Sequence, residues 1–181
     1  MTAPLLIMLG LGVVEFSAVV RAELNIHRAA RYVADILQNQ TSVSAAALQD
    51  YFSAAQYMYE KSGIDGPLTL SAASIKFTNQ DTNGNATAFS YCIAWDASND
   101  GAVPAYTALP AAALAKIGEL TDSYDNDSTI IVEARASVTL PFMPSFYGAI
   151  PPSFTFAAIS RVRPRYVLQI PTNPSPGFSA C

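Results

Sequence analysis

The feature that most constrains this chain is an apolar segment near its start that passes into a polar helix without a break. Residues 4–20 carry a single charged side chain, Glu15, and neither Pro nor Gly occurs between Val13 and Gln38. A bilayer span needs about 20 apolar residues, so this segment is close to the lower limit. It is longer than the apolar part of a signal peptide, and no basic residue precedes it. We therefore expect a retained membrane or filament-core helix and stalk over residues 1–40.

The second half of this segment has one apolar face. Ile26, Ala30, Val33 and Leu37 recur at spacings of 4, 3 and 4, which is one side of an α-helix. Charged residues fill the other sides. The pattern predicts one continuous helix from Pro4 to about Gln38, roughly 50 Å long at about 1.5 Å per residue. Its first half is apolar all round, and its second half is expected to carry a globular head on one side.

Glu15 is the residue of the apolar segment that most needs an explanation. A carboxylate in hydrocarbon costs several kcal/mol unless it is paired or protonated. Arg21 lies six residues farther on, and residues six apart do not share a helical face. Two interpretations stay open. Glu15 lies at the membrane interface and faces water, or it is neutralised in the core of an assembly, by protonation or by an arginine or N-terminal amine of a neighbouring subunit.

The remaining chain predicts an α+β head over residues 41–171, followed by a tail at 172–181. Its second helix runs from Ser42 to about Lys61, with Ser42 or Ser44 as the cap. Val43, Ala47, Tyr51, Ala54 and Met58 recur at spacings of 4, 4, 3 and 4 and are expected to form one face of this helix.

Apolar and polar residues alternate in several later runs, as in half-buried strands. Asn83-Gly84 indicates a hairpin turn between the first two runs, so the sheet is expected to be antiparallel with four or so strands. The runs occupy residues 68–78, 86–95, 130–140 and 154–159.

Composition excludes several classes of function. The net charge is −4, and nucleic-acid binding would need a basic surface. Two cysteines and one histidine cannot form a zinc site. His27 is expected on the exposed side of the stalk, where it is a poor catalytic base, so we expect no enzyme, no metal and no cofactor. The acidic clusters that begin at Asp81 and Asp122 fit solvated turns better than calcium loops.

Several motifs together resemble the TadE/TadG-like pseudopilins, which are components of tight-adherence pili. The apolar segment starts with Pro-Leu-Leu and contains Gly12, Glu15 and Phe16 in a Gly-x-x-Glu-Phe arrangement. An Ala-Ala-Arg amphipathic stretch follows, and residues 160–171 resemble the Arg-Pro-rich final strand of these proteins. The likeness covers about 40 residues well. Two N-terminal registers fit: cleavage after Gly10, or, as we favour, a start upstream of Met1.

The resemblance implies a pilin-like fold and a structural role. The chain would be a structural or assembly subunit, a minor pilin or pseudopilin, that packs against other subunits through Gly12, Glu15, Phe16 and Arg21. The implied partners are other pilin or pseudopilin subunits, an inner-membrane assembly platform and, where an upstream processing site exists, a prepilin peptidase. The head would lie in the periplasm on a single-pass anchor, or outside the cell in the pilus. A membrane-anchored binding or adhesin module that acts outside a filament is the alternative.

An exported location also bears on the two cysteines. Disulfides persist in oxidising compartments, and the cysteine count is even. We expect a bridge between Cys92 and Cys181, with two free thiols as the alternative.

Overall fold

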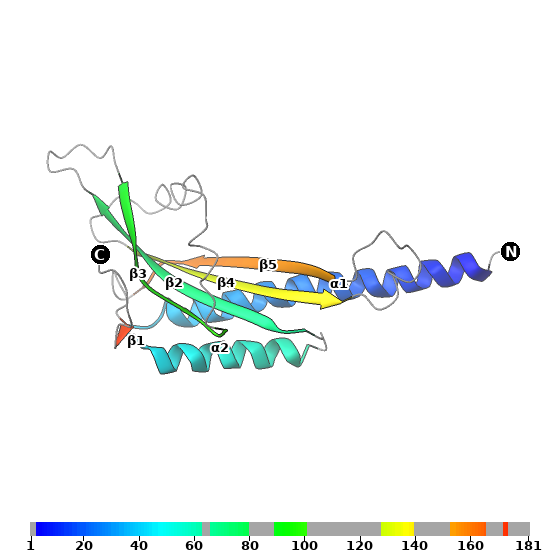
Figure 1. Ribbon diagram of the computed structural model, residues 1–181, viewed down its shortest axis with the longest axis horizontal. Coiled ribbons are helices and arrows are strands. Elements are labelled where there is room, and N and C mark those ends of the chain that lie inside the picture. Colours follow the sequence, from blue (N-terminus) through cyan, green and yellow to red (C-terminus); the bar gives the residue numbers. More distant parts are fainter. Residues whose placement is uncertain are drawn as a thin grey trace.

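The protein is an α+β head built on one long helix (Figure 1). The computed structural model describes residues 3–62, 66–79, 89–100, 128–139, 153–165 and 172–173. The helices are α1 (Ala3–Leu37) and α2 (Ala45–Glu60). The strands are β1 (Val43–Ser44), β2 (Leu68–Asn79), β3 (Phe89–Ser98), β4 (Ser128–Thr139), β5 (Ser153–Val162) and β6 (Thr172–Asn173).

The main sheet has four strands in the order β3-β2-β4-β5, and every neighbouring pair is antiparallel. Helix α1 packs on β4 and β5 and also contacts α2, so both helices cover the same face of the sheet. The first part of α1 extends past the ends of β4 and β5 toward the N-terminus (Figure 1). The α+β class, the single long helix and the antiparallel four-stranded sheet predicted from the sequence are confirmed.

The predicted apolar face of α1 forms its part of the core. Ile26, Ala30, Val33 and Leu37 are each at most 1% exposed. They meet the helix-facing side of β2 and β4, where Leu70, Ala72, Val132 and Ala134 are buried in the same cluster. A stripe at 3.6-residue spacing thus becomes buried wherever the helix lies on the sheet.

Helix α2 buries a different face from the one we expected. Its buried residues are Leu48, Phe52, Ala55 and Tyr59, whereas Met58 of the predicted face is 48% exposed. The two stripes are offset by one residue and both have helical spacing. The buried stripe has the larger apolar area, because Leu48 and Tyr59 stand where the other stripe has Ala47 and Met58, and burial of larger apolar area stabilises more. The Ser44 hydroxyl caps the helix by accepting a hydrogen bond from the Ala47 N–H at 3.1 Å.

The first two strands pair as the predicted hairpin, with one irregularity. The register shifts between Ser74 and Ile75, which pair with Trp95 and Ile93, so Ala94 is the extra residue of a β-bulge. This bulge interrupts the strict alternation expected of β3. The turn residues Asn83 and Gly84 lie outside the described part of the chain.

Asn99 extends this pairing beyond the end of β3. Its side-chain oxygen accepts from the Leu70 N–H at 2.9 Å, and its side-chain nitrogen donates to the Leu68 carbonyl at 2.9 Å. Its own N–H donates to the Leu70 carbonyl at 3.0 Å. One amide side chain therefore satisfies backbone groups that would otherwise lose their partners at a strand end.

Strand β4 is buried on both faces along much of its length, although the sequence predicted one polar face. Ile131 is fully buried and Glu133 is 5% exposed, on the face turned away from the helices. Arg135 accompanies Glu133, with Nε 2.6 Å from Oε1. The ion pair with Arg135 compensates the buried Glu133 carboxylate, so a charged side chain is tolerated at this covered position.

Two connections fix the ends of the head. Thr172 and Asn173, expected in the tail, instead form β6 and pair in parallel with β1, because Val43 and Ser44 offer a free backbone edge before α2.

Gly66 has φ +139°, and a Cβ there would collide with the Ser137 carbonyl oxygen. Only glycine accepts this conformation without strain, so Gly66 sets the entry into β2.

Candidate assembly surface

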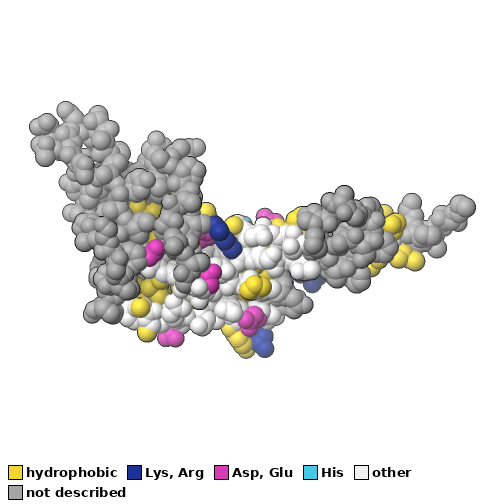
Figure 2. Space-filling model, in the orientation of Figure 1, with side chains coloured by type: hydrophobic (Ala, Val, Ile, Leu, Met, Phe, Trp, Pro, Cys, Tyr) yellow, Lys and Arg dark blue, Asp and Glu magenta, His cyan; other side chains and the backbone are white. Residues whose placement is uncertain are grey.

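The first half of α1 exposes a continuous set of large apolar side chains. Six of them are between 58% and 68% exposed, and they are Leu6, Ile7, Leu9, Val13, Val14 and Phe16. Val20 and Leu24 continue the set at 37% and 51%. Figure 2 shows hydrophobic side chains on this half of the helix, close to its N-terminal end. Exposed apolar surface of this extent on a single element marks an interaction site.

Glu15 lies on the opposite side of this half of the helix. It is 3% exposed, and it precedes the buried residue Ala22 by seven residues, which is two helical turns. The core-facing stripe of α1 therefore continues backward from Ile26 through Ala22 to Glu15. The carboxylate is covered by its own chain, which leaves almost none of its surface for a neighbouring subunit.

The four residues expected to pack against other subunits do not share one face. Phe16 is 68% exposed and Arg21 is exposed, whereas Gly12 is half-buried beside the Glu15 side of the helix. Phe16 and Arg21 are thus available to a partner and Glu15 is not. The apolar side chains around Phe16 were not singled out from the sequence, because a segment that is apolar all round gives no sign of which side its own head covers.

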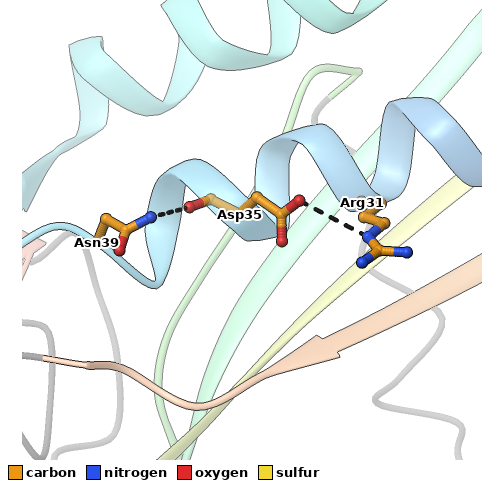
Figure 3. A network of polar contacts seen from close by, with 3 residues as sticks. All are labelled: Arg31, Asp35 and Asn39. Atoms are coloured by element: carbon orange, nitrogen blue, oxygen red, sulfur yellow. Dashed lines mark hydrogen bonds and ion pairs between the residues drawn. The ribbon is translucent and has the colours of Figure 1, made fainter.

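A polar section follows the apolar half on the exposed side of α1. Arg21, Arg28 and Arg31 are all exposed. Arg28 Nη1 lies 3.4 Å from the Asn25 side-chain oxygen, and Arg31 Nε lies 3.7 Å from a carboxylate oxygen of Asp35. Figure 3 shows this last pair beside Asn39, whose side chain donates to the Asp35 carbonyl at 2.8 Å and so caps the end of the helix.

One backbone hydrogen bond ties the end of α1 to the chain that follows β5. The N–H of Arg165 donates to the Gln38 carbonyl at 2.9 Å. Together with the buried stripe, this bond makes the second half of α1 part of the head. The position of the exposed apolar half is therefore set by the fold and not by a flexible linker.

Other candidate sites contribute little in the described part of the chain. His27 is exposed on α1, as expected. No group of three His, Cys, Asp or Glu side chains within the described ranges is placed to hold a metal ion. Cys92 lies in β3, where its backbone pairs with Lys76, but Cys181 and the acidic clusters near Asp81 and Asp122 fall outside those ranges.

Comparison with family models, with curated proteins and with solved structures finds no match to this chain. No helix in the residues that the structure describes is long and apolar enough to cross a membrane.

Proposed function

We propose that this chain is a structural or assembly subunit of a tight-adherence-type pilus, a minor pilin or pseudopilin with a pilin-like fold. It acts by packing the exposed apolar half of α1 against other subunits and has no catalytic role. The observation that carries the proposal is the contrast within one helix. The second half of α1 is core, and the first half presents six large apolar side chains at 58–68% exposure.

The energetics support an assembly role for this half. Full burial of a Val, Leu, Ile or Phe side chain stabilises by roughly 1.5–3 kcal/mol. Six such side chains in water therefore represent a large unrealised gain, which neighbouring helices in a filament or the chains of a bilayer would supply. A single-pass anchor before assembly and a helical filament core after it would use the same surface.

The order of elements also fits the resemblance noted in the sequence. A long N-terminal helix whose second half lies on an antiparallel sheet is the arrangement expected of a pilin-like protein. The proposed partners are other pilin or pseudopilin subunits and an inner-membrane assembly platform. The head would lie in the periplasm or on the outside of the pilus.

The proposal is tested by Phe16→Asp, which places a charge in the exposed apolar surface without touching the core. Tyr57→Asp is the matched control, because Tyr57 is 60% exposed on α2 in the head. Both variants should keep the far-UV circular dichroism of the wild type. Phe16→Asp should lose co-purification with pili and with partner subunits, whereas Tyr57→Asp should retain it. Unchanged co-purification of Phe16→Asp would refute packing through this surface.

A further inference from the structure

One side of α1 carries an apolar stripe that runs nearly parallel to the helix axis. Leu6, Val13 and Val20 recur every seven residues, and Leu24 follows Val20 by four. Their exposed fractions lie between 37% and 64%. At about 100° per residue, the stripe lies roughly 140–180° around the axis from the covered residue Glu15. It is therefore turned away from the head of its own chain.

Two small residues stand in this stripe between the large ones. Gly10 lies between Leu6 and Val13, and a Cβ added to it would meet no atom within 4 Å beyond its own part of the helix. Ser17 follows two turns later, and its hydroxyl donates to the Val13 carbonyl at 2.7 Å, so its polar group is already satisfied. Small residues among large apolar ones let the backbones of two helices approach closely.

The two flanks of the stripe carry opposite charges at the end nearer the head. About 100° per residue places Glu23 roughly 80° to one side of the line midway between Val20 and Leu24, and Arg28 roughly 60° to the other side. Both charged residues are exposed. Neither forms an ion pair within the described part of the chain, where Arg28 contacts only the Asn25 side-chain oxygen, at 3.4 Å. Their charges are thus available to another chain.

We infer that the exposed half of α1 pairs in parallel with α1 of a second copy of this chain, stripe against stripe, with Glu23 of each copy beside Arg28 of the other. The inference rests on the proposed function, because it takes this half as a packing surface, and it names the partner. In a parallel pair with two-fold symmetry, each flank of one helix faces the opposite flank of the other, displaced by about five residues. An antiparallel pair would bring like flanks together, so the charges favour the parallel arrangement.

The same displacement matches side chains farther toward the N-terminus. It places Leu9 beside Val14 of the other copy, and Phe16 beside Arg21 of the other copy. Leu9 and Val14 are each 61% exposed and Phe16 is 68% exposed, so all three have surface to bury. The first contact is apolar, and the second brings a guanidinium group to an aromatic ring, which is a favourable pairing. The covered side of each helix, at Glu15, lies away from the contact, so the two heads face outward.

The test is sedimentation equilibrium of the full-length protein in density-matched detergent micelles, where the wild type should form dimers. Glu23→Arg and Arg28→Glu each replace two ion pairs per dimer by two like-charged contacts, so each should weaken dimerisation about tenfold. An equimolar mixture of the two variants should regain the wild-type affinity, because their heterodimer restores both oppositely charged contacts. Glu60→Arg is the matched control, since it reverses an exposed carboxylate at the end of α2 and should leave the affinity unchanged.

The outcomes separate this inference from the proposed function. A wild type that is monomeric or larger than a dimer, equal weakening by Glu60→Arg, or a mixture no tighter than its components would overturn the parallel pair. The proposed function would still stand if Phe16→Asp lost co-purification with pili, because other subunits would then cover the apolar half. Charge-dependent dimers together with unchanged co-purification of Phe16→Asp would support the pair and refute the role in a pilus.

Discussion

Replacing Phe52 by Ala tests the packing of the head most sharply, because sequence and structure disagree about which face of α2 is buried. Phe52 is fully buried, between α2 and the sheet. Truncation of a buried Phe to Ala costs about 3–5 kcal/mol, from lost apolar burial and from the cavity left behind. Total stabilities of domains are about 5–15 kcal/mol, so this change removes a large share of the free energy of unfolding.

The assay is urea unfolding of the full-length protein in detergent micelles, followed by far-UV circular dichroism and by tryptophan fluorescence. Trp95 is the single tryptophan and is 1% exposed in the same core cluster, so its emission reports on this packing. With a slope of about 2 kcal/mol per M urea, the midpoint should fall by about 1.5–2.5 M. If the tryptophan emission of the variant no longer changes on unfolding, the core around Trp95 is no longer packed.

Met58→Ala is the matched control, since Met58 lies on the face predicted from the sequence and is 48% exposed. Substitutions at such sites usually change stability by no more than about 0.5 kcal/mol. The reverse order, with Met58→Ala costing more than Phe52→Ala, would refute the orientation of α2 described above.

Three further predictions concern single polar side chains. Ser44→Ala should lower stability by about 1 kcal/mol in the same urea assay because the cap is lost, whereas Ser42→Ala should leave the midpoint unchanged. Asn99→Ala should cost about 1–3 kcal/mol, because the part-buried N–H of Leu70 loses its acceptor; a midpoint equal to that of the wild type would show that water replaces it. Burial raises the pKa of Tyr59 above its ordinary value of 10.0, so the wild type should lose stability as pH rises above about 10, where the unfolded chain ionises first. Tyr59→Phe should remove this part of the alkaline loss, and an identical alkaline profile would contradict the assignment.

Much of the fold was predictable because it follows from simple periodicities. The stripe from Ile26 to Leu37 has helical spacing and no competing stripe, so its burial was predicted correctly. The pairing of β2 with β3 followed from two alternating runs around Asn-Gly. These features depend on residues close in sequence, which is where pattern arguments are strongest.

The errors arose where two patterns compete or where distant residues decide. Helix α2 has two apolar stripes one residue apart, and the larger apolar area of Leu48 and Tyr59 selects between them only once the sheet is present. The bulge at Ala94 and the pairing of Thr172 with Val43 depend on partners far away in the chain. For Glu15 the sequence left two interpretations open, the membrane interface and the core of an assembly, and its burial at 3% exposure, two turns before Ala22, was not foreseen.

The central claim is that the side of α1 opposite Glu15 contacts other subunits. Photo-crosslinking in intact cells tests it directly, with benzoylphenylalanine introduced singly at Val13, Phe16, Ala22 and Ile26. The first two positions are 58% and 68% exposed, and the last two are at most 1% exposed. The account predicts cross-links to other subunits from Val13 and Phe16 and none from Ala22 and Ile26. Cross-links of equal yield from all four positions, or from the buried pair alone, would contradict it.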